Sequence, residues 1–413
     1  MHAPLTSTYR AEWRSLSTLA GIADEWRALA ARALEPNVFY EPAFALAAGP
    51  VFGKDAGAML VWSHARLIGL FPARVERWRG GIRPVLAGWS HPYAPLGVPL
   101  VDRDQAEAAI AAWLDHCAAE PKTPALLLLP YVPEHGPFAR ALDAVLARRG
   151  SRSAVFGRHQ RALLDPGSVR QGYLDRAMSA GRRKELRRLR RRLEEIAPVT
   201  FTTADAAQDA GTALKDFMVL EASGWKGLAG TAAANDAAIR SFVETAVTGL
   251  AANGQARVDR LFLNGRAIAA SITLASGDTA WCWKIAYSEG VARFSPGVQL
   301  AFDLTEALLA DPDIAQVDSC ATADHPMIDN IWRERLAVSD RLIAIKPSLL
   351  PFGVARGIES ARRSAIAAAK GLRDRMRPKP SSARPKETPD HLTGGRHRHI
   401  LNEGELSRIL MRR

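Results

Sequence analysis

The same order of expected helices and strands occurs twice along the chain, and this repetition constrains the fold more than any single motif. Residues 22–164 and 173–345 each contain helices, three neighbouring strands, a helix, a strand, a helix and a final strand. In the second half, Asn264-Gly265 separates two of the strands, and Asn-Gly is a strong hairpin signal. We therefore predict an α+β protein in which one unit has been duplicated.

An uninterrupted apolar run, Ala125 to Leu129, indicates how the expected strands and helices are layered. A strand that is apolar on both faces is typical of a sheet that is covered on both sides. The sequence therefore predicts a mixed central sheet flanked by helices.

Changes in composition along the chain indicate where its segments begin and end. We expect a leader without regular structure at 1–20, a first unit at 21–165 and a second unit at 166–346. Residues 347–377 form an expected basic amphipathic helix, because apolar residues recur at intervals of three and four among arginines and lysines. These apolar residues are Val354, Ile358, Ala361, Ala365, Ala369, Leu372 and Met376. Residues 378–413 are rich in Pro, Gly, Lys and Arg, which predicts a largely disordered basic tail.

The net charge of +12 is concentrated in two segments. Residues 347–413 hold 15 Lys/Arg against 6 Asp/Glu, and residues 176–195 hold 9 against 3. The remainder of the chain is close to neutral. The basic helix Arg182–Leu193 buries its leucines on one side. Its charged side either faces solvent or binds nucleic acid.

Cysteine usage and hydropathy indicate the compartment. Cys117, Cys282 and Cys320 are too widely spaced for a zinc site or a disulfide framework, which favours a reducing environment. The first 20 residues contain no signal-like apolar stretch, and no segment approaches the roughly 20 apolar residues of a membrane span. We expect a cytoplasmic protein.

A strand, a turn and a helix start form the clearest candidate for a binding site. The expected strand Thr279–Tyr287 is followed by Ser295-Pro296-Gly297-Val298 at the start of an apolar helix. Helix N-terminal amides lack internal partners and carry partial positive charge, so they suit an anion such as a pyrophosphate, with no metal. The alternative is that Ser-Pro-Gly merely caps the helix.

Lys284 is the most unusual charged residue of this region, because it lies inside an aromatic strand beside Trp283. Strand alternation predicts that Lys284 shares a face with Cys282. We expect its ammonium either to pair with a carboxylate such as Asp318 or to have a lowered pKa that suits catalysis. Asp318 is accordingly a candidate partner or a base for a substrate amine.

Several separated segments resemble one family. They are Leu220–Gly227 (LEASGWKG), Arg266–Ala270 (RAIAA), Trp283–Tyr287 (WKIAY), Phe294–Gly297 (FSPG), Asp318-Ser319 and Met327–Trp332. Together they resemble the BioF2-like or CelD-like (cellulose biosynthesis) acetyltransferases of the GNAT superfamily over about 173–345. The first half is similar only in the order of its elements. Two tandem GNAT-like domains, with the basic helix before the second, are also similar to the FemABX peptidyltransferases.

The resemblance implies acetyl-CoA or another acyl-CoA as donor, with Ser295, Gly297 and Val298 around its phosphates. Backbone amides near the end of strand Thr279–Tyr287 would polarise the thioester carbonyl. Tyr287 is the candidate general acid, unless it is simply a packed aromatic residue.

On the acceptor side, the resemblance suggests Trp225 and Lys226, although Trp225 equally suits a hydrophobic anchor. His325, in the loop after Asp318, is a candidate base or an incidental loop residue.

Three functions follow from these features. The first is an N-acyltransferase that acts on a small-molecule or glycan-precursor amine, in polysaccharide or cell-envelope biosynthesis. The second is a FemABX-like transferase that uses aminoacyl-tRNA. The third is a non-catalytic accessory protein of an envelope polysaccharide synthase, docked on an anionic membrane through the basic tail.

Overall fold

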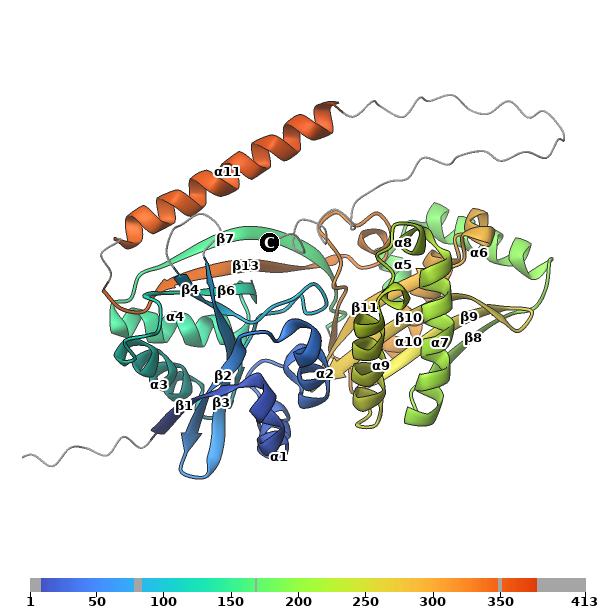
Figure 1. Ribbon diagram of the computed structural model, residues 1–413. Helices are drawn as coiled ribbons and strands as arrows, with labels where there is room; N and C mark the ends of the chain where they lie inside the picture. The colour runs from blue at the N-terminus through green and yellow to red at the C-terminus, as the bar shows by residue number, and fades with distance from the viewer. Residues whose placement is uncertain (1–8, 78–83, 168, 348–350, 377–413) are drawn as a thin grey trace, which may run out of the picture.

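A single sheet runs through both halves of the protein. The computed structural model describes residues 9–77, 84–167, 169–347 and 351–376, without the side chains of Trp225, Lys226 and residues 370–376. In these ranges 13 strands form the sheet, in the order β1-β2-β3-β4-β6-β13-β7-β12-β11-β10-β9-β8, with β5 paired to β3. Helices pack on both halves of the sheet (Figure 1). The predicted mixed α+β fold is thereby confirmed.

The first half follows the predicted order closely. Its elements are β1 (Tyr9–Ser15), η1 (Leu16–Ile22), α1 (Ala23–Ala30), η2 (Val38–Tyr40), α2 (Pro42–Phe52), β2 (Ala56–Ser63), β3 (Arg66–Arg77), β4 (Pro84–Gly88), β5 (Leu100–Val101), α3 (Ala106–Ala119), β6 (Leu126–Pro133), α4 (Pro137–Arg149) and β7 (Ser153–Leu164).

The second half repeats this order. Its elements are α5 (Tyr173–Ala177), α6 (Ala180–Glu194), β8 (Val199–Ala204), α7 (Ala207–Ser223), α8 (Trp225–Leu228), η3 (Ala233–Asn235), α9 (Ala237–Ala251), β9 (Ala256–Leu263), β10 (Arg266–Ser276), β11 (Thr279–Tyr287), η4 (Glu289–Phe294), α10 (Pro296–Ala310), β12 (Gln316–Asp318), η5 (Ile328–Asn330) and β13 (Glu334–Ala344).

The last strand of the second half lies in the sheet of the first half. β13 runs antiparallel to both β6 and β7, so it separates two strands that precede it by more than 150 residues. β7 in turn pairs with β12 through Leu163 and Leu164. The predicted units 21–165 and 166–346 therefore share one sheet and exchange a strand.

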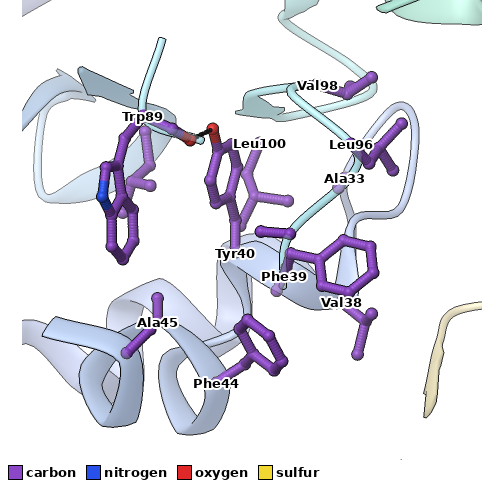
Figure 2. Packing of buried hydrophobic residues seen from close by; sticks show 14 of the residues in the cluster. Ala33, Val38, Phe39, Tyr40, Phe44, Ala45, Trp89, Leu96, Val98 and Leu100 are labelled. Carbon is purple, nitrogen blue, oxygen red and sulfur yellow. Dashed lines mark hydrogen bonds between the residues drawn. The ribbon is translucent and has the colours of Figure 1, made fainter. Parts of the chain in front are cut away.

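The core is continuous across the junction between the halves. Figure 1 shows α2 of the first half beside α9 of the second, and the two helices are in contact. Phe44 of α2 packs edge-to-face on Phe242 of α9, with ring centroids 5.4 Å apart. Figure 2 shows Tyr40 nearby, whose hydroxyl donates a hydrogen bond to the carbonyl oxygen of Trp89. Aromatic packing of this kind fixes the two halves against each other.

One sequence prediction needs correction. Residues 9–20 are not part of an unstructured leader, since β1 pairs with β2 from Tyr9 to Ser15 and Leu19 is fully buried. A half-exposed edge strand has few apolar residues, so its pattern is weak. The basic helix expected at 182–193 is present within α6, where Ser179 caps the first turn by accepting a hydrogen bond from the amide of Arg182. Residues 1–8 lie outside the described ranges.

The expected basic helix is present as α11 (Phe352–Met376). It docks through Ala355, which packs with Phe156 and Leu342, and through an ion pair of 2.7 Å between Arg363 and Asp340. Val354, which belongs to the predicted apolar stripe, instead stays exposed. The predicted tail at 378–413 lies outside the described residues. Within the described ranges, no helix is both long and apolar enough to cross a bilayer.

Candidate active site

Two parallel strands stop pairing at the predicted site. β11 and β12 pair only from Thr279 and Gln316 to Trp281 and Asp318. On its other edge, β11 stays paired with β10 as far as Tyr287. Because β12 ends at Asp318, β11 pairs with no residue of β12 from Cys282 onward.

The direction of the backbone amides follows from the ladder between β10 and β11. The amide of Ser288 donates to the carbonyl oxygen of Ile268 at 2.8 Å, which marks a hydrogen-bonded pair. Because N–H groups alternate between the two edges of a strand, those of Tyr287 and Ile285 point away from β10. They lie on the edge of β11 that continues beyond its pairing with β12.

The start of α10 lies beside the end of β11. Ser295 adopts a left-handed conformation (φ 53°) and its side chain does not cap the helix. Pro296 has no N–H, so the amide of Gly297 is the first that the helix can offer to an anion. A Cβ atom on Gly297 would come within 3.0 Å of Cδ1 of Tyr287. Glycine thus allows the Tyr287 ring to lie against the first turn of α10.

A β-bulge at Trp283 changes the predicted faces of β11. Lys284 is opposite Ile272, whereas Cys282 is opposite the next residue of β10, Thr273. Cys282 packs with the cluster under α10, while Trp283 belongs to the large core on the other side. The prediction that Lys284 and Cys282 share a face is therefore wrong, because the bulge adds a residue that strand alternation does not anticipate.

Lys284 pairs with a glutamate that sequence reasoning left unassigned. Its ammonium lies 3.6 Å from Oε1 of Glu221 on α7 and 4.4 Å from the centre of the Tyr93 ring. The other oxygen of Glu221 accepts a hydrogen bond from the amide of Ala233 at 2.9 Å. Burial and the nearby Glu221 carboxylate raise the pKa of Tyr93. The only available signal for Glu221 was its place in the Leu220–Gly227 segment.

Asp318 is engaged elsewhere, so the predicted ion pair between Lys284 and Asp318 is not formed. Its carboxylate accepts a hydrogen bond from the guanidinium of Arg161, a β7 residue that also donates to the carbonyl oxygen of Pro95 at 2.9 Å. The side chains of both members of this pair are almost completely buried. Arg161 comes from the first half of the chain, and no local pattern around Asp318 indicates it.

The remaining predicted residues lie at the edges of this region. Nδ1 of His325 faces the amides of Met327 and Ile328 at 3.4 and 3.5 Å, so the imidazole packs onto its own turn. Trp225 and Lys226 begin the short helix α8, but their side chains lie outside the described part of the structure. Among the described residues, no group of three or more His, Cys, Asp or Glu side chains is placed to hold a metal ion.

The site has two sides, one on each face of β11. Tyr287, Ser295, Gly297 and the first turn of α10 form the first side. Lys284, with Glu221 and Tyr93, forms the second, at the junction between the two halves. Such an arrangement suits a reaction between an anionic donor and a second substrate that approaches from the other side.

A comparison with known families agrees with this geometry. Residues 180–325 match the model of the acetyltransferase (GNAT) domain. The matched range contains β11, β12, the start of α10 and Glu221. The match supports an acetyltransferase-type domain in the second half, and it does not single out the BioF2-like or CelD-like subfamily. No curated protein matches the sequence.

Solved structures share most of the fold at low sequence identity. FemX is 10% identical, with a TM-score of 0.52 over 78% of this chain and 95% of its own. The C-terminal DUF2156 domain of a putative lysylphosphatidylglycerol synthetase from Agrobacterium fabrum is also 10% identical, with a TM-score of 0.51 over 79% of this chain and 92% of that chain. Both structures share the fold of most of this chain, and the acetyltransferase (GNAT) match lies in its second half.

Proposed function

We propose that the protein is an N-acyltransferase that moves an acyl group from an acyl-CoA to an amine. The edge of β11 that continues beyond its pairing with β12, beside the first turn of α10, carries this proposal. The amide of Gly297 and the helix dipole suit the donor pyrophosphate, with Ser295 and Val298 around it. We infer that the acceptor is a small-molecule or glycan-precursor amine, used in envelope or polysaccharide synthesis.

The chemical step needs no covalent enzyme intermediate. The amine nitrogen attacks the thioester carbonyl carbon, a C–N bond forms, the C–S bond breaks and the amine loses a proton. The outward amides of Ile285 and Tyr287 stabilise the developing oxyanion, an effect worth about 3 kcal/mol per donor in other enzymes. The Tyr287 hydroxyl gives its proton to the departing thiolate and regains one from solvent or from the amine.

The pair formed by Lys284 and Glu221 defines the acceptor side. A glutamate that is 1% exposed and a lysine that is 14% exposed form a charged group of low mobility at the junction of the halves. We infer that this pair, together with Trp225, Lys226 and His325, orients the acceptor amine. Asp318, fixed by Arg161, positions the end of β12 instead of acting as the base.

Calorimetric titration with acetyl-CoA tests the proposed function. We expect wild-type protein to bind, and Gly297→Asp to lose binding because it adds a negative charge to the first turn of α10 and a Cβ atom 3.0 Å from the Tyr287 ring. Gly211→Asp is the matched control, since it adds the same charge to α7, where the nearest atom to the new Cβ is 4.0 Å away. Absence of binding by wild type, or equal binding by Gly297→Asp, would refute the proposal.

The exposed face of α11 favours a second activity, contact with an anionic membrane. Val354 and Ile366 are about half exposed on a helix that also carries exposed Arg356. Apolar and basic groups together suit a surface of anionic lipid. Removal of residues 352–413 should abolish sedimentation with phosphatidylglycerol vesicles. Unchanged sedimentation would exclude this role for the segment.

A further inference from the structure

An open hollow lined by basic side chains lies on the surface of α6. Lys184, Arg187, Arg190 and Arg191 line a volume of about 560 Å³ that is open to solvent. Cavities that bind small ligands typically measure about 300–1,000 Å³. The four residues lie within an eight-residue stretch of one helix, which is a length of roughly 10 Å. The hollow is thus of a size for a phosphorylated small molecule or for one end of a larger one.

Three of these four cations have no carboxylate partner among the residues that the structure describes. On the same helix Arg183 pairs with Asp175 and Arg188 with Glu185, whereas Arg182 and Arg192, outside the hollow, also form no ion pair with any described residue. Among the described residues, Lys184, Arg187 and Arg191 form no ion pair. An ordinary solvated helix face would intersperse both signs of charge, whereas a concave cluster of one sign attracts a counter-ion of the opposite sign.

The fourth cation joins the hollow to the proposed donor site. Arg190 donates to Oε1 of Gln299 at 3.1 Å and to Oδ2 of Asp303 at 2.7 Å, both on α10. Gln299 also donates to the carbonyl oxygen of Phe294, in the turn before the helix, at 2.8 Å. α6 in addition contacts η4 directly. The basic hollow is therefore fixed to the segment that holds the start of α10.

We propose that this hollow binds the 3′-phosphate of the nucleotide end of the acyl donor. The inference rests on the proposed function, since it assigns a second phosphate site to the same donor. The start of α10 holds the pyrophosphate through backbone amides, and α6 holds the terminal phosphate through Lys184, Arg187 and Arg191. A 3′-phosphate carries two negative charges. Three cations that have no carboxylate partner among the described residues should therefore bind it more strongly than a single backbone amide would.

Phosphate groups also occur along the backbone of RNA, so the experiment must separate the two sources. The short length of the cluster favours the small donor, because RNA binding normally uses a longer basic surface. Charge-assisted hydrogen bonds contribute enough that loss of the 3′-phosphate should weaken binding about tenfold or more.

Calorimetry on the full chain with CoA and with 3′-dephospho-CoA tests the proposal. We expect wild type to prefer CoA by about tenfold or more, and Arg187→Glu/Arg191→Glu to lose this preference while it still binds dephospho-CoA. The matched control is Arg182→Glu/Arg192→Glu, which changes the charge of α6 equally at exposed positions outside the hollow. Thermal unfolding of both variants verifies that they are folded.

The outcomes separate this inference from the proposed function. If wild type binds CoA and dephospho-CoA equally well, the second phosphate site is overturned while the donor proposal stands. If neither compound binds, both are overturned. If the protein shows no preference for CoA but binds tRNA with a steep salt dependence that Arg187→Glu/Arg191→Glu removes, the hollow belongs to RNA and the present assignment is wrong.

Discussion

Tyr287 lies where the end of β11 meets the first turn of α10, and its ring is held against Gly297. If its hydroxyl protonates the leaving thiolate, Tyr287→Phe should lower kcat by about 10²- to 10⁴-fold. KM for acetyl-CoA should change little, because the phosphate contacts remain. Steady-state kinetics measure both constants. Tyr131→Phe is a suitable control, since Tyr131 is equally exposed (37% against 38%) but lies on β6. A kcat within twofold of wild type would remove Tyr287 from the mechanism.

The charges of Lys284 and Glu221 stabilise each other in a poorly solvated place. Removal of one partner leaves the other charge buried, which typically costs about 3–5 kcal/mol. We expect Lys284→Met and Glu221→Gln each to lower the free energy of unfolding by about this amount. The double variant should lose clearly less than the sum of the two losses. Urea denaturation of the four proteins measures the coupling, and strictly additive losses would show that the pair contributes no mutual stabilisation.

At the scale of an element, Glu35 makes the attachment of α4 sensitive to pH. Its carboxylate accepts a hydrogen bond from the amide of Phe138, in the first turn of α4, at 2.9 Å. Burial raises the pKa of Glu35 from 4.5 to about 7, although this amide and Arg140 act in the opposite direction. The folded protein therefore holds this proton more tightly than the unfolded chain.

Stability should accordingly fall as pH rises from about 4.5 to about 7, by up to about 1.4 kcal/mol per pH unit from this group. Glu35→Gln should remove that component, so its stability relative to wild type should increase with pH across the window. Urea denaturation at several pH values measures the difference. Glu25→Gln, at an exposed position of α1, is the control. A constant difference between Glu35→Gln and wild type over pH 4.5–7 would contradict the assignment.

The elements also show which parts of the structure local sequence can predict. Strand and turn signals give the bounds of β11 and the hairpin at Asn264-Gly265 correctly, because alternation and hairpin residues act over a few neighbouring positions. The signal that predicts the start of α10, Ser295-Pro296-Gly297, is equally local. By contrast, the bulge at Trp283, which decides the face of Lys284, depends on pairing with β10. The partners Glu221 and Arg161 come from distant segments, so only the folded chain brings them to Lys284 and Asp318.

At the scale of the whole molecule, the exchanged strand β13 makes the two halves depend on each other. Without β13, strands β6 and β7 would each lack a neighbour, and their backbone groups would lose hydrogen-bond partners. The shared aromatic core between α2 and α9 acts in the same direction. Units joined only by a linker would unfold separately, whereas these units should unfold together.

Hydrogen exchange in increasing urea tests this cooperativity. Peptides from β2 and from β10 should lose protection at the same urea concentration, although they come from opposite halves. Leu342→Ala, which removes a fully buried side chain of β13, should shift both sets of peptides equally and cost about 2–5 kcal/mol. Leu308→Ala, a buried α10 position in the second half, should also shift both sets if the sheet unfolds as one unit. Two separate transitions, or a variant that affects only one half, would show that the halves are independent despite their common sheet.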